Sequence, residues 1–149
     1  MENYSKKDKI TVITGTVGVD AHVIGTKIIT RILQDEGFNA VGLGAQTPVE
    51  EFVKVAQETA ADAVFMSSLY GMAEMDVQGI RAKFTEAGLG GILLYIGGIL
   101  GVMKHDWRED EEKFKKIGFD RVYPPETDVR LAIEDLKKDL AFKAKMAAP

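Results

Sequence analysis

The sequence predicts an α/β protein with a doubly wound, five-stranded parallel sheet in flavodoxin-like order, flanked by helices in three layers. Short runs rich in β-branched residues alternate with longer segments of helical period, and this unit recurs five times. The strand-like run at residues 63–66 is apolar throughout, which is typical of a strand covered on both faces. At 149 residues the chain has the length of one domain, with an expected core at about 10–140 and loose tails at both ends.

The first strand–helix–strand unit has clear boundaries. A β-branched run at residues 10–14 predicts a strand that stops at Gly15, and residues 39–43 predict the second strand. Between them, a helix that ends near Gly37 has apolar residues at helical spacing, which we expect on its core face: Ile24, Ile28, Ile29, Ile32 and Leu33.

A capping box predicts the start of the second helix. Thr47 would cap it, Pro48 would take the first helical position, and Glu50 would complete the box. The buried stripe of this helix would be Val49, Phe52, Val53 and Ala56.

The second half of the chain repeats the pattern. We expect, in order, a helix with inner residues Val77, Ile80, Phe84 and Ala87, a strand at 92–96, a helix at about 106–117, a strand at 121–123, and a helix with inner residues Val129, Ile133, Leu136 and Leu140. Gly88, Gly97-Gly98 and Pro124-Pro125 mark the ends of these elements. The tail from about residue 143 is expected to be loose.

The composition excludes several kinds of chemistry. The chain has no cysteine, which rules out disulfides, thiolate metal sites and cysteine nucleophiles. A formal net charge of −4 argues against a nucleic-acid partner, because such affinity rests on clustered Lys and Arg. No apolar run approaches the ~20 residues that span a bilayer, and residues 1–9 lack the apolar stretch of a signal peptide. We therefore expect a cytoplasmic protein with no membrane partner.

Three loops rich in glycine and serine follow the first, third and fourth predicted strands. In open parallel sheets, ligands bind beyond the carboxyl ends of the strands, near the point where the strand order reverses. The loops at 15–25, 67–71 and 97–101 therefore converge on one edge of the sheet. A phosphate-binding glycine loop at 14–18 is disfavoured, because it lacks both the G-x-G-x-x-G spacing and a P-loop lysine.

The first of these loops contains Asp20-x-His22-x-x-Gly25. His22 can offer one ring nitrogen to a metal while the Asp20 carboxylate holds the other. A lone histidine cannot form a protein-only zinc site, but it suits a metal whose other positions are filled by a macrocycle. The alternative, in which both residues only cap the following helix, stays open. His105 is interpreted as a loop or cap residue.

Three motifs in this order carry a resemblance to a known family. Asp20-x-His22-x-x-Gly25, Ser67-x-Leu69 and Gly97-Gly98 resemble the signatures of the cobalamin-binding domains of mutases and methionine synthase. The small-subunit family of glutamate mutase (methylaspartate mutase) is more similar still, through residues 67–71, residues 118–125 and the overall length. This resemblance covers about residues 10–140.

The resemblance implies adenosylcobalamin as cofactor, bound base-off with His22 as the lower axial ligand of cobalt. Asp20 would hydrogen-bond His22, Gly25 would let the nucleotide tail pass close to the first helix, and Gly97 with Gly98 would leave the tail room. The implied cofactor-binding residues are Val19, Asp20, Ala21, His22, Val23, Gly25, Ser67, Ser68, Leu69, Gly97, Gly98, Ile99, Leu100, Gly101, Val102 and Met103. Two of these depart from the family pattern: Ala21 stands where a cysteine is common, and Ile99 where a polar residue often stands.

The resemblance also implies a function as the cofactor-carrying, non-catalytic component of an isomerase. Such a subunit works with a larger, barrel-type catalytic subunit in the radical interconversion of L-glutamate and 3-methylaspartate. Consistent with this, no arginine cluster lies near the three loops to bind a dicarboxylate. The expected docking surface carries Leu69, Tyr70, Met72 and Ile99.

Two other functions remain as alternatives. A methyl-carrying corrinoid protein or a cobalamin sensor usually has a helical bundle before the binding domain, whereas only nine residues precede the first predicted strand here. A flavodoxin-like response or nucleotide-binding module would bind no corrinoid. Several site residues also have purely structural interpretations: backbone satisfaction for Ser67 and Ser68, and core filling for Met72 and Met75.

Overall fold

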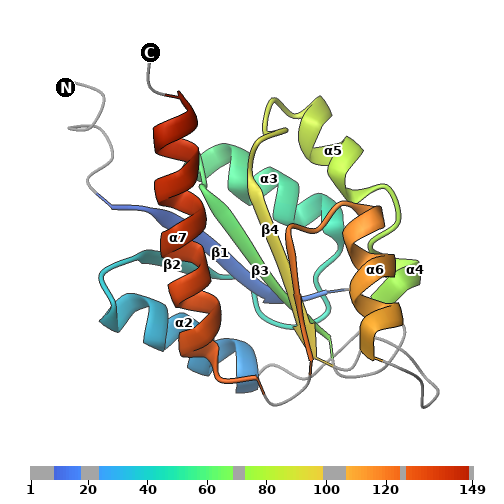
Figure 1. Cartoon of the computed structure of the whole chain (residues 1–149), viewed down its shortest axis with the longest axis horizontal. Coiled ribbons are helices and arrows are strands. Elements are labelled where there is room, and N and C mark those ends of the chain that lie inside the picture. Colours follow the sequence, from blue (N-terminus) through green and yellow to red (C-terminus); the bar gives the residue numbers. More distant parts are fainter. Residues whose placement is uncertain (1–8, 18–23, 69–72, 99–106, 125–126, 148–149) are drawn as a thin grey trace.

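Five parallel strands form the centre of the molecule, and helices cover both faces (Figure 1). The computed structural model describes residues 9–17, 24–68, 73–98, 107–124 and 127–147. The strands are β1 (Thr11–Thr16), β2 (Asn39–Gly42), β3 (Ala63–Ser68), β4 (Leu93–Gly98) and β5 (Arg121–Tyr123). Their order across the sheet is β2-β1-β3-β4-β5, which confirms the flavodoxin-like prediction. The connections reverse direction between β1 and β3, so a ligand is expected at the carboxyl ends of these strands.

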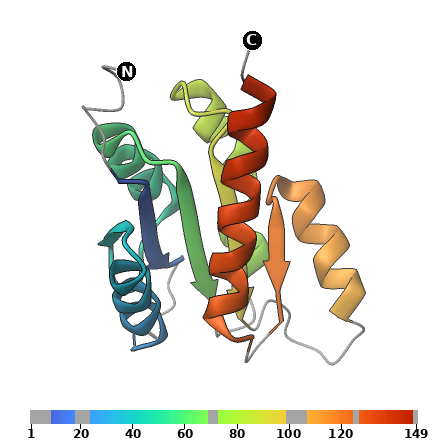
Figure 2. The ribbon, with the colours of Figure 1, turned by 60° about the vertical axis from the view of Figure 1, so that its left-hand side comes forward.

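The helices form two layers. α2 (Ile24–Asp35) and α7 (Val129–Ala147) pack side by side on one face of the sheet (Figure 2). The short α4 (Ala73–Asp76), α5 (Ile80–Glu86), α6 (Trp107–Ile117) and α3 (Val49–Thr59) lie on the other face. Each face has its own apolar cluster, so the sheet is buried on both sides, as the unbroken apolar run of β3 predicts. In the described parts of the chain, no helix is both long and apolar enough to cross a membrane.

Three strands extend further than predicted at their carboxyl ends. β1 continues to Thr16, β3 to Ser68 and β4 to Gly98, each two residues beyond the expected end. Glycine and serine predict strand ends, but here the parallel ladder continues through them. Gly15 lies inside β1. A Cβ at this position would lie 2.8 Å from the Phe52 ring of α3, so this position of the strand needs a residue without a side chain.

The predicted capping box of α3 is wrong. Helix α3 begins at Val49, and Pro48 occupies the N-cap in an extended conformation with no side-chain cap. The Thr47 hydroxyl instead donates backwards to Ala45 O at 3.3 Å, and the Glu50 carboxylate accepts from Lys83 Nζ at 2.7 Å. The Thr47 hydroxyl therefore stabilises the turn before α3, and the Glu50 carboxylate pairs with a lysine of α5.

Two helices differ from the prediction in extent. The predicted third helix begins only at Ile80, because Gly79 before it adopts a positive φ of 74°, so Val77 is buried but lies between α4 and α5. Ala87, expected on its inner face, is the half-buried C-cap of α5. The last helix continues to Ala147, so residues 143–147, expected to be loose, are helical.

The inner face of α2 is also more polar than predicted. Ile28, expected in the core, is 54% exposed, whereas Thr26 is buried. The Thr26 hydroxyl pairs with the Thr16 hydroxyl at 2.9 Å, and the Thr30 hydroxyl pairs with the Thr14 hydroxyl at 2.7 Å. The threonine hydroxyls of β1 and α2 thus form hydrogen bonds with each other. Because these buried polar groups have partners, polar residues can occupy a helix face that packs on the sheet.

Candidate cofactor-binding site

One row of the sheet, at the carboxyl ends of the strands, contains several of the predicted site residues. Thr16 pairs with Ser67, Ser67 with Gly97, and Gly97 with Tyr123, so four strands contribute one residue each. The serine and glycine motifs, which lie about 30 residues apart in the sequence, are therefore direct neighbours. This confirms that the carboxyl ends of β3 and β4 meet at one edge.

A pocket of about 250 Å³ lies between this end of the sheet and helices α2 and α7. Its lining is mostly apolar or aromatic, and glycines replace side chains at one end. The lining includes Ile29 of α2, Phe65 and Ser67 of β3, Tyr95, Gly97 and Gly98 of β4, Tyr123 of β5, and Val129 and Ala132 of α7. A pocket of this kind suits a flat, largely apolar group.

Aromatic rings from three neighbouring strands line the pocket. The Phe65 and Tyr95 rings stack with centroids 5.1 Å apart and planes inclined by 17°. The Tyr123 ring is tilted against Tyr95, with centroids 5.9 Å apart. These rings offer an aromatic wall against which another ring system can pack.

The hydroxyl groups of both tyrosines donate to carboxylates of α7. Tyr95 donates to Asp139, and Tyr123 donates to Asp135 Oδ2 at 2.7 Å. Burial, and then these neighbouring carboxylates, raise the pKa of both tyrosines far above the usual range. The two phenols therefore stay neutral at ordinary pH.

Gly98 must be glycine for steric reasons. Its φ of 108° is unfavourable for other residues, and a Cβ there would lie 2.1 Å from the carbonyl oxygen of Ser68. Gly97 is also tightly placed, since a Cβ would lie 3.3 Å from Cβ of Tyr123. A side chain at Gly98 would therefore clash with the backbone of β3, and one at Gly97 would crowd Tyr123, which lines the pocket.

The two neighbouring serines of β3 differ in their surroundings. Ser67 is half-buried and lines the pocket. Ser68 is fully buried, does not line the pocket, and its hydroxyl has no hydrogen-bond partner in the described structure. Successive residues of a strand face opposite sides of the sheet, which explains the difference. A buried hydroxyl without a partner is costly, and such a group is common where a ligand completes a site.

The other predicted site residues are only partly covered by the described chain. Gly25 lies in the first turn of α2. The following lie outside the described residues: Val19, Asp20, Ala21, His22, Val23, Leu69, Ile99, Leu100, Gly101, Val102 and Met103, together with Tyr70, Met72 and His105. Met75 is 70% exposed, so its interpretation as core filling is wrong. In the described ranges, no three His, Cys, Asp or Glu side chains form a group that could hold a metal ion.

Sequence reasoning missed the walls of the pocket. Phe65 and Tyr95 were expected only as strand residues, and Thr127 and Ala132 were given no role in the site. A signal was present, because Phe65, Ser67, Tyr95 and Gly97 alternate along their strands and so face the same side. The same alternation therefore adds Phe65 and Tyr95 to the side of the sheet on which Ser67 and Gly97 lie.

The flavodoxin-like sheet has a mostly apolar pocket and a glycine pair at the carboxyl ends of its strands, an arrangement that can hold a cofactor. The family described as "B12 binding domain" matches residues 10–133. The glutamate mutase sigma subunit of Clostridium cochlearium is 49% identical over 133 residues, which cover 89% of this chain and 97% of that protein. That of Carboxydothermus hydrogenoformans is 50% identical over 134 residues, covering 90% and 98%. The chain belongs to the B12-binding domain family and, within it, to the family of glutamate mutase sigma subunits.

Solved structures support the fold. A cobalamin-binding protein from Desulfitobacterium hafniense DCB-2 is similar with a TM-score of 0.70 at 21% identity, over 87% of this chain and 58% of that one. The monomethylamine corrinoid protein of Methanosarcina barkeri is similar with a TM-score of 0.65 at 23% identity, over 89% and 60%. At these identities the likeness concerns the fold alone.

Proposed function

We propose that the chain is the cofactor-carrying subunit of a glutamate mutase. In this proposal His22 would hold the cobalt of adenosylcobalamin, and the chain would present the cofactor to a larger, barrel-type catalytic subunit. The single observation that carries the proposal is the identity of 47–50% to four of the glutamate mutase sigma subunits, over nearly their whole length. The curated relatives favour this function over that of a methyl-carrying corrinoid protein. The cytoplasmic location remains a prediction.

The described residues fit the nucleotide tail of the cofactor. The pocket offers ring faces from Phe65, Tyr95 and Tyr123 to a planar base, and Ser67 adds a hydroxyl. Gly97 and Gly98 line the pocket without contributing side chains to it.

The proposed division of labour follows from what the chain contains. When bound, adenosylcobalamin supplies the radical chemistry of the rearrangement. His22, oriented by Asp20, would hold the cobalt, while the pocket on the α2/α7 face would take the displaced tail. The threonine pairs between β1 and α2 hold together the two elements that flank residues 18–23, and these residues include His22. The substrate and its binding residues would belong to the catalytic subunit.

The two histidines of the chain make a matched test of cobalt ligation. Purified protein is mixed with adenosylcobalamin, and the visible spectrum of wild type is compared with His22→Ala and the control His105→Ala. Wild type and His105→Ala should give a base-off, histidine-coordinated spectrum that His22→Ala lacks. Retention of that spectrum in His22→Ala, or a cobalt that keeps its own base, would contradict the assigned ligand.

Turnover tests the need for a partner. The isolated chain with adenosylcobalamin should show no rearrangement of glutamate, and activity should appear when a larger mutase subunit is added. Turnover by the isolated chain would contradict the proposed division into a cofactor-carrying and a catalytic subunit.

A further inference from the structure

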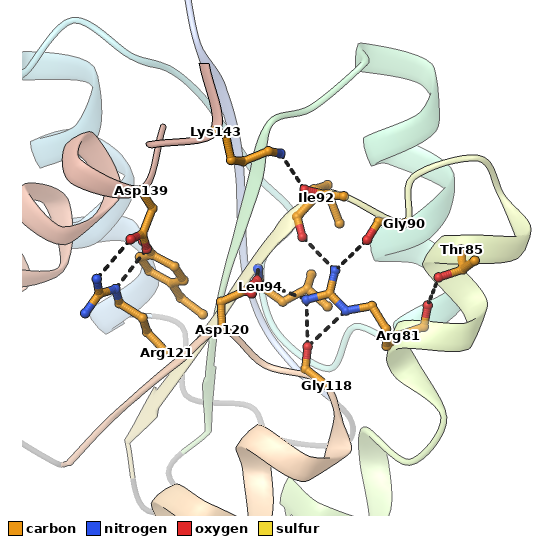
Figure 3. A network of polar contacts seen from close by, with 12 residues as sticks. Arg81, Thr85, Gly90, Ile92, Leu94, Gly118, Asp120, Arg121, Asp139 and Lys143 are labelled. Carbon is orange, nitrogen blue, oxygen red and sulfur yellow. Dashed lines mark hydrogen bonds and ion pairs between the residues drawn. The ribbon is translucent and has the colours of Figure 1, made fainter. Parts of the chain in front are cut away.

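A polar network joins two tyrosines of the aromatic wall, and the neighbouring strand β5, to helix α7. Arg121 of β5 binds Asp139 of α7 through two parallel hydrogen bonds, Nε to Oδ2 at 2.8 Å and NH2 to Oδ1 at 2.9 Å (Figure 3). Arg121 also lies 3.6 Å from Asp135 Oδ2. The hydroxyls of Tyr95 and Tyr123 donate to these two carboxylates. We call these five residues the α7 latch.

The α7 latch connects opposite walls of the pocket. The rings of Tyr95 and Tyr123 line the wall formed by the sheet, while Val129 and Ala132 of α7 line the wall formed by helices. Asp135 follows Ala132 by less than one helical turn, so the tyrosine hydroxyls hold α7 close to the point where it borders the pocket. The position of α7 thereby sets the distance between the two walls.

Burial and geometry make the latch stronger than other polar ties of α7. The side chains of Asp135 and Asp139 are 13% and 22% exposed and that of Arg121 is 37% exposed, and the two parallel hydrogen bonds between Arg121 and Asp139 add directionality. A second tie, between Lys137 and Glu36 at 3.1 Å, joins side chains that are 45% and 41% exposed. Such exposed pairs contribute little to stability. The latch is therefore the main directional restraint on this part of α7.

Apolar packing alone would not hold α7 in one position. Ile133 and Leu136 bury their side chains against the sheet, but apolar contacts are non-directional and tolerate small shifts and rotations. Asp135 and Asp139 lie four residues apart on one helical face, so bonds to both fix the rotation and the height of the helix. The latch also occupies the phenol donors, because each tyrosine hydroxyl donates to a carboxylate of α7.

We propose that the α7 latch is a positioning device that sets the width of the pocket, and so favours corrinoids that carry a nucleotide tail over those without one. This inference rests on the proposed function, because it assumes that the pocket takes the tail. The latch residues act through the wall that they hold, not through contact with cobalt or substrate.

The test compares a corrinoid with its tail and one without it. Dissociation constants for adenosylcobalamin and for tail-less adenosylcobinamide are measured for wild type, Asp139→Ala, the ring-preserving double variant Tyr95→Phe/Tyr123→Phe, and the control Lys137→Ala. Asp139→Ala should weaken adenosylcobalamin binding about tenfold, equivalent to ~1.4 kcal/mol, and change adenosylcobinamide binding less than about twofold. The double tyrosine variant should show a smaller loss in the same direction, and Lys137→Ala none.

The outcomes separate this inference from the proposed function. Equal losses for both corrinoids in Asp139→Ala, or no loss for either, would overturn the latch while wild-type binding of adenosylcobalamin still supports the function. Wild-type protein that binds neither corrinoid would overturn both.

A second measurement needs no ligand and applies to any variant that remains folded. Amide exchange in residues 135–140 should be faster in Asp139→Ala than in wild type, because this part of α7 loses its hydrogen bonds to Arg121 and Tyr95. Lys137→Ala should leave this exchange unchanged. Equal protection in wild type and Asp139→Ala would overturn the positioning role even if affinity fell.

Discussion

The two ends of the sheet use their polar groups in opposite ways. At the amino ends of β4 and β5, the Arg81 guanidinium donates to three carbonyl oxygens and to the Asp120 carboxylate (Figure 3). Asp120 in turn accepts from Leu94 N at 2.8 Å. At the carboxyl ends, the pocket is mostly apolar, glycines leave space, and the Ser68 hydroxyl has no partner in the described structure. At the amino ends, the polar groups form hydrogen bonds with each other. At the carboxyl ends, the pocket leaves room for a ligand.

This contrast shows that the size of a hollow does not identify a binding site. The hollow at the amino ends has a volume of about 570 Å³, more than twice that of the pocket at the carboxyl ends. Four of its charged lining residues are already bonded to each other: Arg81 to Asp120, and Arg121 to Asp139. The smaller pocket combines aromatic faces with missing side chains, a combination that suits a cofactor.

The largest effect is expected from Gly98→Ala at the carboxyl end. The new Cβ would meet the Ser68 carbonyl oxygen at 2.1 Å, and φ would stay in a region that alanine avoids. We expect the free energy of unfolding to fall by about 4 kcal/mol, or the chain not to fold. Urea unfolding of both variants measures this against Gly91→Ala, where the added Cβ would lie 3.8 Å from Lys143 Nζ, the end of a flexible side chain. Similar losses in the two variants would contradict the steric argument.

A smaller effect is expected from Arg81→Ala at the amino end. Without the guanidinium, the carbonyls of Gly118 and Ile92 lose a donor and Asp120 loses its ion pair. The free energy of unfolding should fall by about 2–3 kcal/mol, because hydrogen bonds of partly buried groups are lost. The folded variant should bind adenosylcobalamin as wild type does, since this network lies at the other end of the sheet. Weaker cofactor binding by folded Arg81→Ala would show that the two ends are coupled.

The elements of the fold could be predicted from the sequence because strands and helices differ in period and length. The ends of the strands could not be predicted. Gly15 and Gly97 suggest strand ends in the sequence, but both lie inside strands, at positions where a side chain would crowd Phe52 or Tyr123. Ile28 was placed in the core by its apolarity. Ile28 is exposed because Thr26 faces the sheet instead and pairs with the Thr16 hydroxyl. This pairing depends on β1 and α2 lying side by side, so the apolar periodicity of the sequence does not reveal it.

For the site, the sequence located the edge but not the pocket. Ser67 and Gly97 could be placed at one edge because parallel strands end together. The aromatic wall was missed because Tyr95 reads as a buried strand residue. A buried tyrosine needs a partner for its hydroxyl, and that requirement hints at a polar network. Asp139 could not be identified as that partner, because the contact joins residues 44 positions apart.

A pair of hydroxyl deletions sharpens the contrast between satisfied and unsatisfied groups. Ser68→Ala removes a buried hydroxyl that has no hydrogen-bond partner among the described residues, so the cofactor-free protein should gain about 1 kcal/mol in free energy of unfolding. Thr30→Val removes the partner of the buried Thr14 hydroxyl and should lower it by about 1–2 kcal/mol. Chemical denaturation of both variants gives the two signs. A loss in Ser68→Ala as large as that in Thr30→Val would mean that the serine hydroxyl stabilises the protein by itself.

The smallest effect is confined to alkaline pH and separates the α7 latch from the Arg81 network. Burial and the neighbouring carboxylates raise the pKa of Tyr95 and Tyr123 in the folded protein, whereas both phenols titrate near their usual pKa of about 10 when unfolded. Because the folded state keeps these protons longer, their contribution to stability is complete below about pH 10 and declines as the pH rises further. The free energy of unfolding of Tyr95→Phe/Tyr123→Phe, measured from about pH 8 to 11, should therefore fall less steeply than that of wild type. Arg81→Ala should keep the wild-type slope, since none of the groups bonded to Arg81 is a tyrosine. Parallel curves for wild type and the double variant would show that the two phenols lose their protons as easily in the folded protein as in the unfolded chain.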